Sequence, residues 1–168
     1  MLRVIHSMKE LDFRQLMQVY IEGNRENGME FYPDLPENQQ ILQAEQDFYA
    51  YLREFFKDSR SFYAVWAPDG AYVAALRMEP YADGLLLEAL ETAPEHRGKG
   101  YAKELVRQTL AMLAEREDVV IYSHVNKKNM ASLAVHAACG FLRISEHAAY
   151  ADGSVLHSSC TLSYTLSK

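Results

Sequence analysis

The chain contains only two cysteines, Cys139 and Cys160, among its 168 residues. Two cysteines are too few for the disulfide framework of a small secreted domain, so we expect reduced thiols, with a single bridge between the two as the alternative. No hydrophobic run approaches the roughly 18 residues that a membrane span needs, and the first residues turn polar too soon for a signal peptide. The sequence therefore predicts a cytoplasmic protein with no membrane partner.

Internal repeats, low-complexity stretches and linkers rich in proline or serine are also absent. Hydrophobic residues make up 49% of the chain and charged residues 24%, which is the balance of an ordinary globular protein. A chain of this length most simply forms one domain. We therefore expect a single domain over residues 1–168.

Positive charge is scarce, since 17 Lys and Arg stand against 23 Asp and Glu, for a net charge of −6. This balance argues against nucleic acid as a partner. Residues 1–94 carry eight Lys and Arg and sixteen Asp and Glu, whereas residues 95–168 carry nine and seven. A phosphate-bearing ligand is thus favoured in the second half and a cationic ligand beside the first. An acidic surface that only keeps the protein solvated is the other interpretation.

Two helices are predicted in the first third of the chain. Residues 7–10 have the form of a capping box, and hydrophobic residues follow at helical spacing until Gly23 and Gly28 interrupt the pattern. A second helix is expected to open at residues 34–37. The residues between the two, 29–32, are predicted to form a loop rich in large hydrophobic groups.

The rest of the chain alternates between strand-like and helix-like segments, with turns at 68–70, 82–84 and 151–153. The predicted elements are strands over 62–67, 71–78 and 85–92, a helix over 98–115, a strand over 119–122, a helix over 129–138 that ends at Gly140, and strands over 141–150 and 154–166. This order describes an α+β domain with one mixed sheet.

The segment from Thr92 to Ala102 has the features of a ligand-binding turn. It ends a strand, turns through Gly98 and Gly100 and enters a helix, so that unpaired backbone N–H groups meet the positive end of the helix. Such a turn is suited to phosphate, and Arg97, Lys99 and Lys103 add positive charge there. It is not a Walker loop, and Lys103 replaces the third glycine of a dinucleotide fingerprint. A purely structural turn is the alternative.

Two motifs resemble those of a known family, the GCN5-related N-acetyltransferases. Residues 97–102, Arg-Gly-Lys-Gly-Tyr-Ala, match the signature Arg/Gln-x-x-Gly-x-Gly/Ala, and Asn129 leads a helix that ends in Gly140-Phe141, as in the family's second motif. The resemblance covers nearly the whole chain. It implies a mixed α+β fold in which helices flank a central, mostly antiparallel sheet that is splayed between its fourth and fifth strands.

The resemblance also implies acetyl-CoA, or another acyl-CoA, as co-substrate. The phosphates would bind at the turn, the thioester carbonyl would meet a backbone N–H of the preceding strand, and the following helix would hold the cofactor from the other wall. The implied cofactor-binding residues are Leu90, Thr92, Arg97, Gly98, Lys99, Gly100, Tyr101, Ala102, Asn129 and Ser132.

Transfer to an amine needs a base for the acceptor and an acid for the departing thiolate. The family commonly has a tyrosine acid seven residues after the asparagine, and this chain has His136, which is expected to point at the cofactor sulfur. His136 could act as the general acid, donate a hydrogen bond to the sulfur or have no role in the reaction. Glu88 and Glu91 are the base candidates, with Glu88 favoured. Strand alternation puts these two on opposite faces unless a bulge intervenes, and deprotonation through water is an alternative.

The predicted function is an acyl-CoA-dependent N-acyltransferase that acts by direct transfer in a ternary complex. The acceptor would be a primary amine of a small molecule, a peptide or a protein. The resemblance implies that Phe31 and Tyr32, in the loop between the first two helices, shape its pocket. A catalytically silent acyl-CoA-binding module on the same fold is the alternative. We expect a monomer or homodimer, and no metal site, because His124, His136 and Cys139 match no recognised ligand spacing.

Overall fold

The computed structural model describes residues 1–115 and 119–166. Its helices are α1 (Phe13–Val19), α2 (Ile21–Phe31), α3 (Glu37–Phe55), the 3₁₀ turn η1 (Pro94–His96), α4 (Tyr101–Ala114) and α5 (Met130–Ala138). Its strands are β1 (Leu2–Ile5), β2 (Phe62–Trp66), β3 (Ala74–Tyr81), β4 (Gly84–Thr92), β5 (Val120–Asn126), β6 (Leu142–Ser145), β7 (Ala148–Ala149), β8 (Val155–Leu156) and β9 (Ser159–Thr165).

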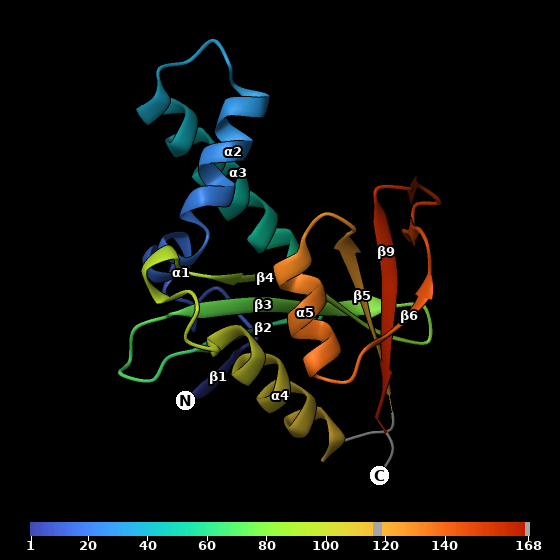
Figure 1. Cartoon of the computed structure of the whole chain (residues 1–168). Helices are drawn as coiled ribbons and strands as arrows, with labels where there is room; N and C mark the ends of the chain where they lie inside the picture. Colours follow the sequence, from blue (N-terminus) through green and yellow to red (C-terminus); the bar gives the residue numbers. More distant parts are fainter. Residues whose placement is uncertain (116–118, 167–168) are drawn as a thin grey trace.

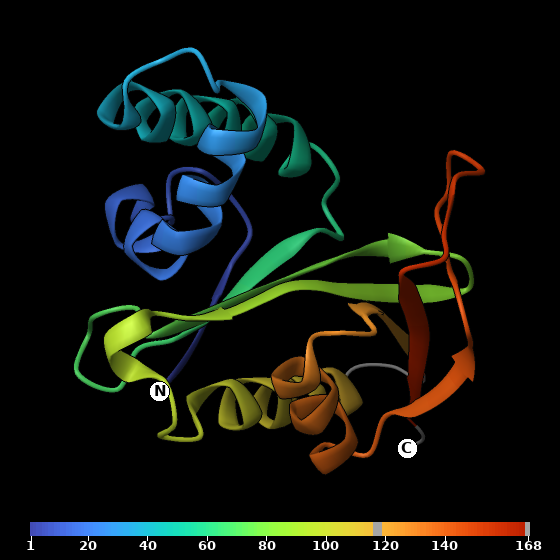
Figure 2. The ribbon, with the colours of Figure 1, turned by 45° about the horizontal axis from the view of Figure 1, so that its top comes forward.

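Seven of these strands form one sheet in the order β1-β2-β3-β4-β5-β9-β6. The β4–β5 pair is parallel and the other neighbouring pairs are antiparallel. Helices α1, α2 and α3 cover one face of the sheet, and α4 and α5 cover the other (Figure 1; Figure 2). The expectation of an α+β fold with a mixed, mostly antiparallel sheet is confirmed.

The fourth and fifth strands separate after a short parallel contact. They pair from Leu85–Ile121 to Leu87–Ser123, where the described register stops, while β4 continues to Thr92 and β5 to Asn126. The predicted splay between the fourth and fifth strands is therefore present.

A bulge in β4 changes which side chains share a face. Arg77 of β3 lies opposite Glu88, and Ala75 lies opposite Glu91, so two steps along β3 match three steps along β4. Ala89 within the bulge has a φ of 51°, in the left-handed region. Residues opposite each other in an antiparallel pair share a face, so Glu88 and Glu91 both face the side covered by α1–α3. Alternation alone would put these two glutamates on opposite faces, but the bulge, which the sequence analysis gave as the exception, is present, so they share a face.

The beginning of the chain differs most from the sequence-based expectation. Ser7 and Glu10 do bond, with Ser7 Oγ donating to Glu10 Oε1 at 3.0 Å, but α1 begins only at Phe13, where Asp12 caps it. Strand β1, which was not predicted, pairs with β2.

Residues 29–31, expected in a loop, belong to α2, which continues through both of its glycines. Gly28 packs so closely on α3 that a Cβ built there would lie 2.7 Å from the Gln40 carbonyl oxygen. This glycine therefore permits the contact between α2 and α3 instead of ending the helix.

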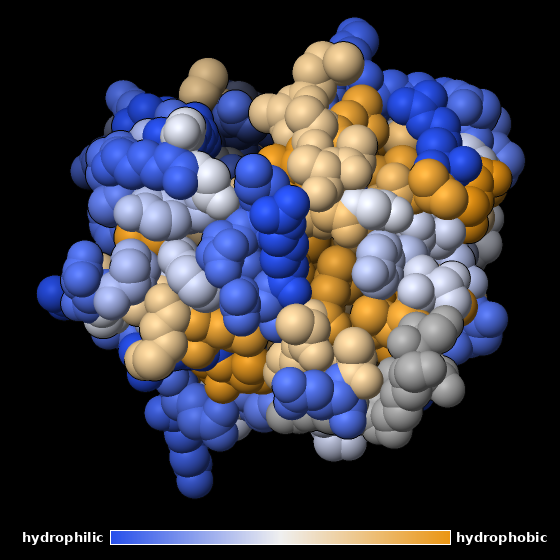
Figure 3. All heavy atoms as spheres, turned by 60° about the horizontal axis from the view of Figure 1, so that its bottom comes forward, coloured by the Kyte–Doolittle hydropathy of each residue, from blue (hydrophilic) through white to orange (hydrophobic). Residues whose placement is uncertain are grey.

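Two hydrophobic clusters fill the space on the two faces of the sheet. One includes Leu76, Leu105 and Ile121 under α4, and the other includes Leu16, Leu52 and Tyr63 under α1–α3. Hydrophobic residues also reach the surface, and Figure 3 shows one face on which they lie between hydrophilic areas.

Both cysteines are free thiols. Within residues 1–115 and 119–166, no helix has the length and hydrophobicity needed to cross a membrane.

Candidate functional site

The turn between β4 and α4 forms the wall of a cleft. Gly98 and Gly100 have φ values of 75° and 80°, and Gly100 is the residue from which α4 begins. The first N–H groups of a helix have no partner within the helix, so this turn presents donors to whatever lies in front of it. A Cβ built on Gly98 or Gly100 would meet no described atom within 4 Å, so the backbone is open to a ligand.

We call this cavity, of about 570 Å³, the turn cleft. It is lined by Leu90, Glu91, Thr92, His96, Arg97, Gly98, Gly100, Tyr101, Ala102, Lys103, Asn129, Ala131, Ser132 and Val135. Nine of the ten cofactor-binding candidates from the sequence thus surround one space. The tenth, Lys99, is outside this lining set, and its Nζ donates to the Glu95 carbonyl at 3.2 Å.

Asn129 caps α5 from the far wall of the turn cleft. Its Oδ1 accepts a hydrogen bond from the Ser132 N–H at 3.0 Å. The carboxamide oxygen is therefore used for capping, and the amide nitrogen Nδ2 is the group that can donate to a ligand.

Arg97 reaches from the turn toward α2. Its Nη2 lies 2.6 Å from Glu22 Oε2 and 3.8 Å from Glu91 Oε2, and its Nε donates to the Thr92 carbonyl at 3.2 Å. Arg97 thus lines the turn cleft together with Glu91 and also pairs with Glu22 of α2.

His136 lies in the interior of the protein. His136 is only 1% exposed. Its ring packs against the ring of Phe141, and the two ring centroids are 5.0 Å apart. Nδ1 donates to the Ser132 carbonyl at 2.8 Å, and Nε2 is buried with no hydrogen-bond partner among the described residues. Burial lowers the pKa of His136, and the bond to Ser132 opposes this. His136 is outside the set that lines the turn cleft, so the expected orientation toward it is not observed.

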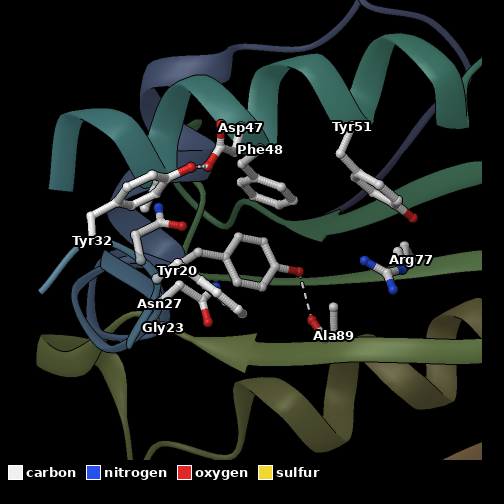
Figure 4. A pocket seen from close by; sticks show the side chains of 12 residues that line it. Tyr20, Gly23, Asn27, Tyr32, Asp47, Phe48, Tyr51, Arg77 and Ala89 are labelled. Atoms are coloured by element: carbon white, nitrogen blue, oxygen red, sulfur yellow. Dashed lines mark hydrogen bonds between the residues drawn. The ribbon is translucent and has the colours of Figure 1, made fainter. Parts of the chain in front are cut away.

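A second cavity, of about 360 Å³, lies between α1–α3 and the sheet, and we call it the aromatic cavity (Figure 4). It is lined by Tyr20, Gly23, Asn24, Asn27, Phe31, Tyr32, Ala44, Asp47, Phe48, Tyr51, Arg77 and Ala89. Phe31 and Tyr32, the two acceptor-pocket candidates from the sequence, are both part of this lining.

Hydrogen bonds fix two of the rings in the aromatic cavity. Tyr20 Oη donates to the Ala89 carbonyl at 2.6 Å, which ties α1 to the bulge, and Tyr32 Oη donates to the Asp47 carboxylate (Figure 4). Burial raises the pKa of Tyr51 to about 12, so this phenol stays neutral.

The two base candidates have different surroundings. Glu88 Oε2 lies 2.5 Å from Arg77 Nη2, and both side chains are largely buried. Glu91 is 44% exposed beside Arg97, and burial raises its pKa while Arg97 opposes the rise. Glu79, which also interacts with Glu88, has its pKa raised by burial.

Sequence reasoning missed most polar residues of the aromatic cavity. Asn24, Asn27 and Asp47 lie on α2 and α3, and no motif in the sequence distinguishes them. Arg77 could have been noticed in the sequence, because it is the only charged residue of the predicted strand over 71–78. No group of three or more His, Cys, Asp and Glu that could hold a metal occurs within the part of the chain that the structure describes.

The splay between β4 and β5 and the glycine turn at the start of α4 are the features that the resemblance to the GCN5-related N-acetyltransferases implied. The model of the acetyltransferase (GNAT) family matches residues 14–141. The chain belongs to this family, as its two motifs predicted.

Solved structures with low sequence identity share the fold. The PaiA N-acetyltransferase of Thermoplasma acidophilum in complex with coenzyme A is 14% identical, with a TM-score of 0.67 and coverage of 98% of this chain and 99% of that one. A phosphinothricin acetyltransferase of Sinorhizobium meliloti in complex with AcCoA is 16% identical, with a TM-score of 0.65 and coverage of 99% and 88%.

One curated relative is more similar in sequence. Streptothricin acetyltransferase of Streptomyces lavendulae is 34% identical over 85 residues. The match spans 50% of this chain and 45% of the relative, so it covers less than half of the relative's length.

Proposed function

We propose that this chain transfers an acetyl group from acetyl-CoA to a primary amine of a small cationic acceptor, by direct attack in a ternary complex. The observation that carries the proposal lies at the bulge of β4. Ala89 lines the aromatic cavity, and the next residue, Leu90, lines the turn cleft. An acyl donor in one cavity and an amine in the other would therefore meet at adjacent residues, which direct transfer requires.

The turn cleft has the chemistry for the donor. Gly98 and Gly100 leave the backbone open, the start of α4 supplies N–H donors for a pyrophosphate, and Arg97 supplies charge. When bound, acetyl-CoA supplies the activated thioester. The register of β3 and β4 passes from Glu88 to Glu91 without pairing Ala89 or Leu90, and in the proposed complex a backbone N–H of these two residues polarises the thioester carbonyl.

The aromatic cavity fits a cation. Helix α2 carries three glutamates and one arginine, and α3 carries four carboxylates and one arginine. Tyr20 and Phe48 provide ring faces, to which ammonium groups are attracted, whereas the ring of Tyr51 already lies under the Arg77 guanidinium, 4.9 Å from the ring centroid. Streptothricin, which names the curated relative, is the first acceptor to test.

The reaction forms a C–N bond between the amine and the acetyl carbon and breaks the C–S bond of the thioester. The ammonium form of the acceptor loses one proton before attack, and the nitrogen loses a second as the amide forms. One of these protons neutralises the departing thiolate and the other goes to solvent. Glu88 and Glu91 are suited to attract the ammonium, because both carboxylates face the acceptor side of the sheet.

One observation favours a catalytically silent acyl-CoA-binding module as a second candidate. His136, at the position of the family's tyrosine acid, is buried under α5 with its only unbonded nitrogen inside the protein. A thiolate in the turn cleft would then have no donor from this side chain. In the enzyme, water in the cleft would supply that proton.

Release of free thiol from acetyl-CoA across a panel of amines tests the proposal. The panel contains streptothricin, spermidine, a peptide with a free N-terminus and a neutral hydroxylated amine. We expect the polycationic amines, streptothricin and spermidine, to give the fastest release of thiol. No release with any amine, together with a thermal shift by acetyl-CoA that exceeds the shifts by ATP and NAD, would establish the silent module; equal shifts would refute the cofactor itself.

The role of His136 is tested by His136→Phe, which keeps an aromatic ring against Phe141. We expect transfer at a rate within a few-fold of the unaltered protein. A variant that binds acetyl-CoA normally but has lost transfer would instead restore His136 as the general acid.

A further inference from the structure

The hydroxyl of Tyr20 is bonded to the backbone of the β4 bulge. Tyr20 Oη donates to the Ala89 carbonyl at 2.6 Å (Figure 4). Tyr20 is buried, and its ring packs edge-on against Phe48, with the two ring centroids 5.4 Å apart. Burial raises the pKa of Tyr20 well above its usual value, so the hydroxyl keeps its proton and remains a donor. The bond therefore holds one carbonyl of the bulge in a fixed direction.

The carbonyl of Ala89 and the N–H of Leu90 belong to the same peptide unit. A peptide unit is planar and almost always trans, so its C=O and N–H bonds point in opposite directions. Tyr20 lines the aromatic cavity, so the Ala89 carbonyl points toward a hydroxyl on that side and the Leu90 N–H points away from it. Leu90 lines the turn cleft. Tyr20 thus fixes the direction of an N–H group between the two cavities.

Regular sheet pairing does not hold the backbone at this point. Ala89 has a φ of 51°, in the left-handed region that residues with a Cβ rarely adopt. Such a conformation persists where the surrounding contacts determine it. The register of β4 with β3 skips Ala89 and Leu90, and the described pairing of β4 with β5 ends at Leu87. The register thus leaves the orientation of this peptide open, and the hydrogen bond from Tyr20 fixes it.

We propose that Tyr20 is a positioning residue that aims the Leu90 N–H at the carbonyl oxygen of the bound thioester. The inference rests on the proposed function. As the amine attacks and the C–N bond forms, the carbonyl oxygen takes up negative charge, which the Leu90 N–H stabilises. The electron pair returns as the C–S bond breaks and the thiolate leaves. The hydrogen bond to the Ala89 carbonyl also polarises the peptide, which makes its N–H a stronger donor.

The variant Tyr20→Phe removes the hydroxyl and keeps the ring that packs against Phe48. With streptothricin as acceptor, we expect kcat to fall about 10- to 100-fold. This is less than the roughly 10²–10³ that loss of a whole oxyanion donor costs, because the N–H is misdirected and not deleted. The KM for acetyl-CoA and for streptothricin should not change, since the affected contact strengthens only in the transition state. An unchanged kcat would overturn the inference.

The matched control is Tyr72→Phe. Tyr72 is buried in the same hydrophobic cluster as Tyr20, and its Oη accepts a hydrogen bond from the Asp12 N–H at 3.3 Å. Each variant removes one tyrosine hydroxyl that is bonded to the backbone, so a general loss of packing should affect both. We expect Tyr72→Phe to retain the full kcat. An equal fall in the two variants would show a structural effect and overturn the inference.

The infrared spectrum of the bound thioester reports on the N–H contact without any acceptor. Acetyl-CoA labelled with ¹³C at the acetyl carbonyl is bound, and difference spectra record its C=O stretch, which moves to lower wavenumber as the oxygen accepts a stronger hydrogen bond. Tyr20→Phe should raise this wavenumber relative to the unaltered protein, and Tyr72→Phe should not. Equal wavenumbers in the three proteins would overturn the inference.

This spectrum also separates the inference from the proposed function. If acetyl-CoA does not bind, both fail. If it binds but no amine is acetylated, the proposed function fails, and the C=O stretch still decides whether Tyr20 orients the donor. If transfer occurs and neither kcat nor the C=O stretch responds to Tyr20→Phe, only the inference is overturned. If Tyr20→Phe does not fold, the amide proton resonance of Leu90 in the unaltered protein decides. It should move downfield with acetyl-CoA but not with CoA, and equal shifts with both would overturn the inference.

Discussion

Arg97 in the turn before α4 is paired with Glu22 in α2 at 2.6 Å, across the end of β4. Arg97 lines the turn cleft, whereas α2 contributes to the aromatic cavity. Both side chains are 46% exposed, so the pair itself contributes only about 0–1 kcal/mol to stability. Its significance is that one guanidinium connects the wall of the proposed cofactor site with the helix that forms the proposed acceptor site.

Replacing Arg97 with Gln should weaken acetyl-CoA binding while leaving stability nearly unchanged. A charged hydrogen bond to phosphate contributes about 1.5–3 kcal/mol, so we expect an affinity at least roughly tenfold lower. Calorimetric titration with acetyl-CoA measures this. Glu22→Gln is the control, because it removes the partner in α2 and keeps the guanidinium, and it should bind acetyl-CoA at least as well. Equal affinities of Arg97→Gln and the unaltered protein would contradict the assignment.

Two glycines of the same helix should respond oppositely to alanine. At Gly28 a Cβ would lie 2.7 Å from the Gln40 carbonyl oxygen, so Gly28→Ala should force α2 away from α3 and cost about 1–3 kcal/mol. At Gly23 a Cβ would meet no described atom within 4 Å, so Gly23→Ala should stabilise the helix by about 0.5–1 kcal/mol. Unfolding in urea measures both. The packing argument fails if Gly28→Ala is as stable as the unaltered protein.

Asp47 should contribute to recognition of a cationic acceptor. Its carboxylate lines the aromatic cavity and accepts hydrogen bonds from Tyr32 Oη and, at 3.2 Å, from Gln43 Nε2. We expect Asp47→Asn to raise the KM for streptothricin about tenfold at low salt, with a smaller effect at high salt because the attraction is screened. Steady-state kinetics at two ionic strengths test this.

Glu54→Gln is the control for Asp47→Asn. It removes the same charge from the same helix, at an exposed position where Glu54 pairs with Lys57. The KM for streptothricin should stay within twofold of that of the unaltered protein. If both variants raise KM equally, the effect comes from net charge and not from the cavity.

The buried His136 should make the protein less stable in mild acid. Burial lowers the pKa of His136 in the folded state below that of the unfolded chain, which is near 6.5. The unfolded state therefore binds more protons in this range, so the free energy of unfolding falls as pH drops below about 6.5 and levels off below the lowered pKa. His136→Phe should show a smaller loss between pH 7 and pH 5. Urea unfolding at several pH values compares the two proteins, and parallel curves would contradict the prediction.

Elements defined by local chemistry could be predicted from the sequence. The turn at residues 97–100 and the helix after it follow from glycines that adopt positive φ and from hydrophobic spacing in α4. The hairpin turns around Gly70 and Ala82 likewise separate β2 from β3 and β3 from β4. These features depend on the conformational preferences of a few neighbouring residues.

Features that depend on distant contacts were not predictable. Gly28 looked like a helix breaker, but it allows α2 to approach Gln40 of α3. Sequence spacing placed His136 on the same helical face as Asn129, yet packing against Phe141 buries its ring. A single sequence contains no information on which neighbour a helix face will meet, and that neighbour decides which side chains are exposed.

The sequence by itself determined the family, the position of the phosphate-type turn and the order of most helices and strands, because each is encoded in short motifs and local periodicity. Only the tertiary structure decided that Glu88 and Glu91 share a face and that Arg77 forms an ion pair with Glu88. The physical reason is the bulge at Ala89 and the divergence of two strands, which are set by packing across the sheet and not by the residues beside them in the chain.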